Sequence, residues 1–198
     1  MACSLSNSVD RTEKHFERRE KQYEQAIKSL GGVDKPAQMF TVLVNTFEEN
    51  PYQDFLGKLY MNLNLGSHWH GQFFTPYHVC DCMARMMIEN QDVKREIEQK
   101  GYVSICDPCV GGGAMLIAAA STFSRLGINY QESVVFVGQD LDPVVAKMAY
   151  IQLSLLGCPG YITVANTLTD PQRGQVLFPQ EHEHQDVWIT PMFMSQIW

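Results

Sequence analysis

The sequence has no apolar run long enough to cross a membrane. Its longest such run covers residues 114–120, whereas a membrane-spanning helix needs about 20 apolar residues. Met1–Ser4 leads into a polar, charged segment rather than into the apolar centre of a secretory leader. We therefore expect a protein with no membrane span and no signal peptide, located in the cytoplasm.

The sequence also lacks the excess of basic residues that is usual in proteins that bind DNA through its phosphates. It has 15 Lys and Arg against 22 Asp and Glu, which gives a net charge of −7. Because phosphate binding depends on a basic surface, this deficit predicts that the chain alone binds DNA weakly. The net charge does not exclude a local basic strip or DNA binding through a partner.

Clear metal-binding patterns are missing as well. The six cysteines are expected to be reduced thiols in a cytoplasm. Two pairs, Cys80-x-Cys82 and Cys106-x-x-Cys109, have a spacing that zinc sites use, but the first falls in an apolar helix and the second beside a strand end. The pairs His68-x-His70 and His182-x-His184 lie in polar loops. We expect no metal site.

The chain is predicted to have two parts, with no internal repeat. A helical region covers residues 1–70, with helices expected over 10–30, 36–47 and up to residue 63. Thr75 and Pro76 are expected to open a further helix as N-cap and first helical residue. An α/β domain then covers residues 71–198, and the loop around 64–71 is the expected hinge.

The second part alternates short apolar strands with helices, which is the pattern of a parallel sheet with right-handed crossovers. We expect a Rossmann-like α/β sheet of about four parallel strands. The strands are expected at 102–106, 133–139, 161–166 and 186–190, and the helices at 114–127 and 143–157.

A glycine-rich turn follows the first expected strand, in Asp107-Pro-Cys-Val-Gly111-Gly-Gly113. Such a turn lets a ligand approach the backbone beside the free N–H groups of the next helix. Asp140, at the end of the second strand, is placed to accept hydrogen bonds from ribose hydroxyls. These features favour a nucleoside-type cofactor. The structural alternatives are a tight turn without a ligand and a helix cap at Asp140 or Asp142.

Four motifs in order resemble those of adenine-N6 DNA methyltransferases, above all the modification subunits of type I restriction systems. The stretch 71–76, GQFFTP, resembles a signature of that family, and 107–113 resembles its DPxxGxG turn. The stretches GQDLDP (138–143) and ANTLTD (165–170) resemble its second and third strand motifs. The resemblance implies S-adenosylmethionine (SAM) as cofactor.

The resemblance also implies roles for individual residues. Thr75 would contact the methionine carboxylate and Asp140 the ribose, while Asn166 would contact the adenine amino group; without a ligand, Thr75 is a helix cap and Asn166 a turn residue. The remaining implied cofactor residues are Phe73, Phe74 and Pro76 as lid and wall, Asp107, Gly111 and Gly113 at the methionine part, and Leu141 and Leu168 around the adenine ring.

In the family, the loop after the fourth strand reads NPPF or NPPY and holds the flipped target adenine. The corresponding loop here is Thr190-Pro191-Met192-Phe193. Thr190 and Pro191 would accept the amino hydrogens and Phe193 would stack on the base. Thr in place of Asn and Met in place of Pro put methyl transfer in doubt, although they leave cofactor binding intact.

The family's domains continue beyond this loop, so we expect a sheet truncated at its C-terminal side, with an unpaired edge that favours a homodimer or a specificity or other partner subunit. Two functions follow. The first is a SAM-dependent adenine-N6 DNA methyltransferase of the type I modification kind. The alternative is an inactive SAM-binding homologue that serves a partner protein as a regulatory or decoy subunit.

Overall fold

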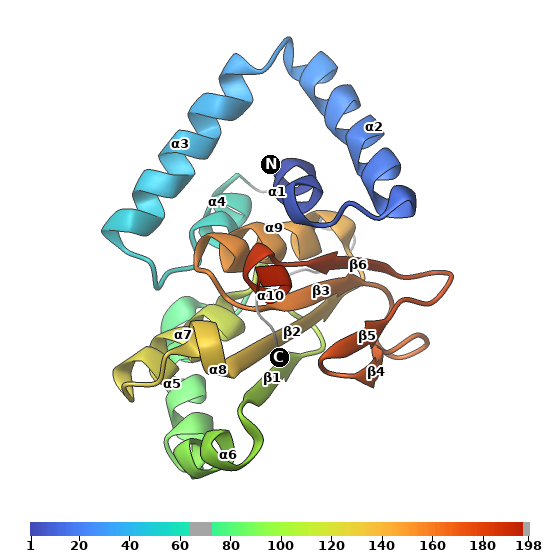
Figure 1. Cartoon of the computed structure of the whole chain (residues 1–198). Helices are drawn as coiled ribbons and strands as arrows, with labels where there is room; N and C mark the ends of the chain where they lie inside the picture. The colour runs from blue at the N-terminus through green and yellow to red at the C-terminus, as the bar shows by residue number, and fades with distance from the viewer. Residues whose placement is uncertain (64–72, 196–198) are drawn as a thin grey trace.

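A computed structural model describes residues 1–63 and 73–195 and places a four-stranded sheet at its centre (Figure 1). The strand order is β1-β2-β3-β6, and a separate pair, β4 with β5, forms a hairpin beside it. The strands are β1 (Val103–Asp107), β2 (Val134–Asp140), β3 (Gly160–Val164), β4 (Arg173–Gln175), β5 (Phe178–Gln180) and β6 (Asp186–Ile189).

The predicted Rossmann-like α/β fold is confirmed, but the direction predicted for the fourth strand is wrong. Strands β1, β2 and β3 are parallel, whereas β6 pairs with β3 in the antiparallel direction, with Ile189 beside Tyr161. A parallel return needs a crossover of a dozen or more residues, usually a helix. The segment between β3 and β6 instead forms the β4–β5 hairpin, and the chain re-enters the sheet at the end where β3 leaves it, with Asp186 beside Val164.

The helices that connect the parallel strands cover one face of the sheet. Nine residues of α7 (Ala114–Arg125) are buried, and α9 (Pro143–Leu155) packs beside it. Asp142 begins α9 by accepting hydrogen bonds from the N–H groups of Val144 and Val145, 2.8 and 3.4 Å away. The shorter helices are α6 (Val93–Lys100), α8 (Tyr130–Ser133) and α10 (Pro191–Ser195).

The helix α5 (Tyr77–Ile88) starts one residue later than predicted. Pro76 occupies the N-cap position and no side chain caps the helix, so the prediction that Thr75 is the N-cap is wrong. The buried stripe of α5 is Cys80, Ala84 and Ile88, and it packs on α7.

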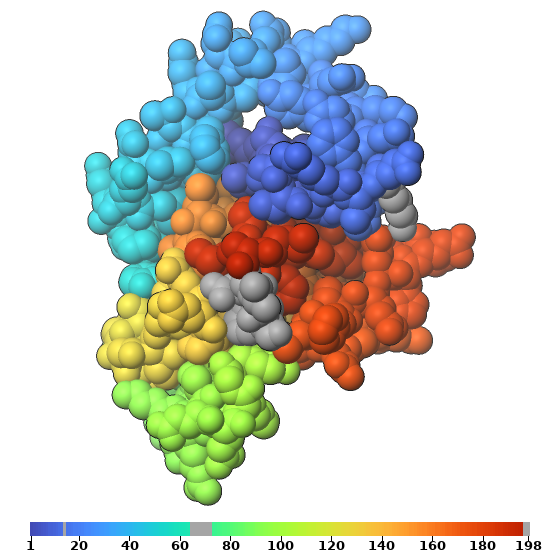
Figure 2. Space-filling view, in the orientation of Figure 1, coloured from blue at the N-terminus to red at the C-terminus, as the bar shows by residue number. Residues whose placement is uncertain are grey.

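The N-terminal region is helical, as predicted, and projects from the sheet (Figures 1 and 2). Its helices are α1 (Ala2–Val9), which the sequence did not predict, α2 (Glu13–Leu30), α3 (Asp34–Glu49) and α4 (Phe55–Asn62). Gly31, at a φ of 77°, ends α2 in the left-handed conformation. The predicted hinge and the predicted boundary at residue 70 lie outside the described residues.

The buried side chain of Arg19 joins α2 to strand β6. The guanidinium of Arg19 is fully buried and donates to Asp10 Oδ2 (2.7 Å) and to the Val187 carbonyl (2.7 Å). The group also lies 4.4 Å from the centre of the Trp188 ring. Burial acts to raise the pKa of Asp10, but hydrogen bonds from His15, Thr12 and Arg19 lower it to about 2. Arg19 therefore anchors the N-terminal helices to the sheet through the Val187 carbonyl, and its ion pair with Asp10 lies within the N-terminal region.

No helix within residues 1–63 and 73–195 is long and apolar enough to cross a membrane.

Candidate functional site

Backbone hydrogen bonds hold the glycine-rich turn between β1 and α7 in place. The Val110 N–H donates to the Gln139 carbonyl (2.9 Å) and the Gly113 N–H donates to the Val110 carbonyl (2.8 Å). Gly111 and Gly113 have φ angles of 55° and 98°, a region that glycine occupies without strain. A Cβ on Gly113 would lie 3.3 Å from the Cα of Ala149 in α9. The glycines thus serve both the turn and the packing of two helices.

Two carboxylates flank this turn. Asp140 Oδ2 accepts a hydrogen bond from the Gly111 N–H (2.9 Å), and its Oδ1 accepts one from the Asp142 N–H (2.9 Å). Asp142, rather than Asp140, caps α9. Asp107 accepts a hydrogen bond from the Cys109 N–H (3.0 Å). Burial raises the pKa of Asp107, the Asp140 carboxylate adds to the rise, and the Cys109 hydrogen bond opposes it.

A cavity of about 410 Å³ opens at the carboxyl ends of the parallel strands. Large apolar side chains stand exposed around it: Phe73 is 85% exposed, Leu141 67% and Leu168 93%. Seven of the sequence-predicted cofactor residues line it, namely Phe73, Phe74, Gly111, Asp140, Leu141, Asn166 and Leu168, together with Pro108, Cys109, Val145 and Thr167. The structure therefore brings together residues from four separate chain segments.

The other predicted cofactor residues lie beside this cavity rather than in its wall. Thr75 and Pro76 line a neighbouring cavity that shares Phe74, while Asp107 and Gly113 stand at the two ends of the glycine turn. Asn166 also acts as a turn residue, since its Oδ1 accepts a hydrogen bond from the Leu168 N–H (2.9 Å).

The loop after β6 lies at the opposite edge of the sheet. Because β6 is antiparallel, Thr190 follows the strand end beside the start of β3, about 13 Å along the strand from the end that borders the cavity. The Thr190 hydroxyl is buried and donates to the Cys158 carbonyl (2.8 Å). Phe193 is 8% exposed and packs against Tyr161. This placement sets Thr190, Pro191 and Phe193 apart from the cavity, and their role at the target base stays a prediction.

Sequence reasoning missed a buried polar group behind the glycine turn. The Gln152 Nε2 donates to Asp54 Oδ1 (2.9 Å) and to the Gly112 carbonyl (2.7 Å). Its Oε1 accepts a hydrogen bond from the Leu56 N–H (3.0 Å). Asp54 and Gln152 thus join α4 to the turn. Two features of the sequence could have indicated this group: a glutamine within the apolar helix α9, and an aspartate just before a helical run.

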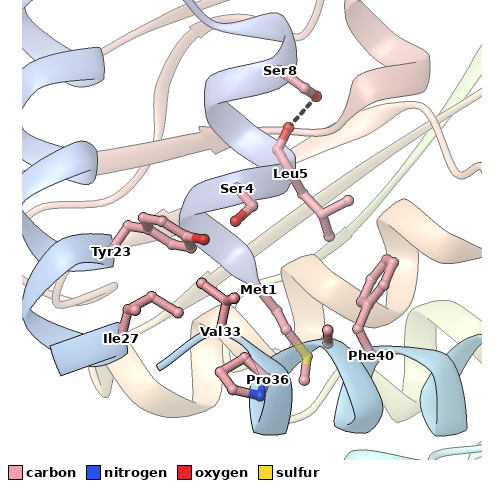
Figure 3. Close-up of a pocket in the computed structure, with 10 residues that line it drawn as sticks. Met1, Ser4, Leu5, Ser8, Tyr23, Ile27, Val33, Pro36 and Phe40 are labelled. Atoms are coloured by element: carbon pink, nitrogen blue, oxygen red, sulfur yellow. Dashed lines mark hydrogen bonds between the residues drawn. The ribbon is translucent and has the colours of Figure 1, made fainter. Parts of the chain in front are cut away.

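A cavity of about 300 Å³ lies among α1, α2 and α3 (Figure 3) and is bordered mainly by apolar side chains such as Leu5, Ile27 and Phe40. Its polar side chains are hydroxyls, including those of Ser4, Ser8 and Tyr23. The lining side chains carry no charge.

Among the described residues, no group of three or more His, Cys, Asp or Glu side chains is placed to hold a metal ion. Cys106 and Cys109 are exposed thiols. The pair His68 and His70 lies outside the described residues.

The family model for N-6 DNA Methylase matches residues 52–198, which is more than half of the chain. The chain belongs to the N-6 DNA methylase family. The match to this family includes the glycine turn, Asp140 and Asn166, and it begins just before α4.

Two relatives are similar over part of their length. The type I restriction enzyme MjaIX methylase subunit of Methanocaldococcus jannaschii is 28% identical over 119 residues, which are 60% of this chain and 19% of that protein. A crystal structure of the type I restriction-modification system methyltransferase subunit from Streptococcus thermophilus is 26% identical, with a TM-score of 0.43. That match covers 62% of this chain and 25% of the other. The chain thus spans a quarter or less of either relative.

Proposed function

We propose that the cavity at the carboxyl ends of β1, β2 and β3 binds S-adenosylmethionine. The observation that carries this proposal is the convergence of Phe73, Gly111, Asp140 and Asn166 on one cavity. Ligands of open α/β sheets bind at this edge. The membership of the N-6 DNA methylase family supports the same cofactor, because this family's reaction needs a methyl donor.

The residues present fit the chemistry of that cofactor. Each oxygen of Asp140 keeps a lone pair after accepting its backbone hydrogen bond, so the carboxylate can still accept from two ribose hydroxyls. Leu141 and Leu168 offer apolar surface to a flat ring. The negative charges of Asp140 and Asp107 suit a ligand whose amino and sulfonium groups are positive. When bound, SAM supplies the methyl group.

For the complete protein we propose adenine-N6 methylation of DNA, as in type I modification subunits. The names of the two relatives point to such a subunit, and a subunit works within a larger assembly. The net charge of −7 supports weak DNA binding by this chain alone. DNA contact would then come from a specificity or other partner subunit, or from a second copy.

A second candidate is favoured by one specific observation. The Thr190 hydroxyl donates a hydrogen bond to the Cys158 carbonyl and accepts one from the Gly160 N–H. Both contacts lie at the start of β3, at the opposite end of the strand from the cavity. In this arrangement none of the three proposed target-base residues is within reach of a methyl donor held by Asp140. We therefore propose that this chain alone binds SAM without transferring the methyl group, and that it serves a partner protein.

Calorimetric titration with SAM, followed by labelled methyl transfer to unmethylated DNA, tests both proposals. We expect one SAM bound per chain and no transfer by the chain alone. We also expect the double variant Thr190→Asn/Met192→Pro to remain inactive, because restoring the family's residues does not move the loop to the cavity. The absence of SAM binding would refute the cofactor site. Transfer by the double variant would show that the loop reaches the cavity.

A further inference from the structure

A second cavity, of about 550 Å³, adjoins the proposed SAM cavity at the Phe74 side chain, which lines both. The Phe74 ring stacks on the Tyr60 ring of α4, with 5.4 Å between their centres. The second cavity is lined by Asp54, Gly57, Lys58, Met61, Asn62, Phe74, Thr75, Pro76, Tyr77 and His78. Helix α4 of the N-terminal region therefore forms one of its walls, opposite the start of α5.

The position of α4 is fixed relative to the glycine turn. Asp54 Oδ1 accepts hydrogen bonds from the Gly57 N–H and from Gln152, each 2.9 Å long. A Cβ on Gly112 would lie 3.4 Å from the Cα of Gly57, so the two backbones touch. Lys58 follows Gly57 directly and donates its N–H to the Asp54 carbonyl (3.2 Å). The base of the Lys58 side chain is thus held beside the turn.

The charges of the second cavity suit an anionic group. Asp54 is 4% exposed, and its Oδ1 already accepts two hydrogen bonds. Lys58 is exposed and carries the one permanent positive charge among the lining side chains that the structure describes. The hydroxyl of Thr75 and the amide of Asn62 add neutral hydrogen-bond donors. Charge-assisted hydrogen bonds to a carboxylate are roughly twice as strong as neutral ones.

We propose that the second cavity receives the amino-acid end of SAM and that Lys58 pairs with its carboxylate. The inference rests on the proposed SAM site, since the nucleoside part would occupy the first cavity and extend past Phe74 into the second. It makes α4, a helix outside the glycine turn and the sheet, part of the cofactor site. Lys58 then determines specificity for a ligand that keeps its amino-acid end over one that has lost it.

The test compares two ligands by calorimetric titration of the full chain: SAM, and 5′-methylthioadenosine, which lacks the amino-acid end. We expect Lys58→Met to weaken SAM binding about tenfold or more and to leave 5′-methylthioadenosine binding within about twofold. Lys58→Arg should retain most of the SAM affinity. Lys35→Met removes the same charge from α3, beside a different cavity, and should change neither affinity.

The outcomes separate this inference from the proposed function. Failure of the wild-type chain to bind either ligand would refute the SAM site itself. Wild-type binding of both ligands, with Lys58→Met unchanged for SAM, would overturn the role of Lys58 and leave the SAM site standing. An equal loss for both ligands would overturn it as well, because Lys58 would then act on the fold rather than on the carboxylate. Circular dichroism of each variant identifies a folding defect.

Discussion

Asp140→Ala is expected to lower the affinity for SAM by about 100-fold or more. A hydrogen bond to a charged group contributes about 1.5–3 kcal/mol, and the variant loses two such bonds to the ribose, which corresponds to at least that factor. The variant also removes the acceptor of the Gly111 N–H, so the hydrogen bond from Val110 to Gln139 is left to join the glycine turn to β2. Calorimetric titration of the folded variant measures the change.

Asp142→Asn is the matched control, because it removes the same charge two residues away. Asp142 caps α9 by accepting from the N–H groups of Val144 and Val145, and an asparagine can cap a helix about equally well. We expect its SAM affinity to stay within about threefold of wild type. Equal losses in the two variants would mean that general negative charge, rather than Asp140 itself, attracts the cofactor.

Arg19→Met is expected to lower the free energy of unfolding by about 3–5 kcal/mol, the usual cost of breaking a buried ion pair. The change leaves Asp10 without one partner and the Val187 carbonyl without its side-chain donor. It also removes one of the two cations over the Trp188 ring, the other being Lys147. Urea denaturation followed by circular dichroism measures the loss, and the N-terminal helices should detach first because Arg19 joins them to β6.

Arg18→Met is the control for Arg19. Its side chain is 36% exposed and pairs with Asp186, and exposed ion pairs contribute about 0–1 kcal/mol. The double variant Arg19→Met/Asp10→Asn should recover part of the stability, since it removes the uncompensated buried charge. A loss of less than about 1 kcal/mol in Arg19→Met would show that Arg19 does not anchor the helices to β6.

The sequence predicted the parts of the fold that local patterns determine. The glycine turn was readable because its conformation demands glycine at Gly111 and Gly113. The end of α2 was readable because Gly31 adopts the left-handed conformation. The three parallel strands followed from their alternation with helices. In the same way, the convergence of Gly111, Asp140 and Asn166 follows from parallel strands that all end at one edge.

Features that depend on distant contacts could not be predicted. The direction of β6 is determined by its pairing with Tyr161 and by Arg19, which lies far away in the chain. A strand's own residues are compatible with either direction. The same limit applies to Gln152, whose partners Asp54 and Gly112 are 98 and 40 positions away. The predicted direction of the fourth strand was therefore wrong, although the strand itself was correctly found.

Hydrogen exchange of the chain with and without SAM tests the central claim most directly, because it reports where the cofactor binds. We predict that SAM slows exchange in peptides covering residues 73–76, 108–113, 138–142 and 166–168, with no change at 187–193. Protection at Thr190 to Phe193 with none at Asp140 would contradict the account, since the cofactor would then lie at the opposite edge of the sheet.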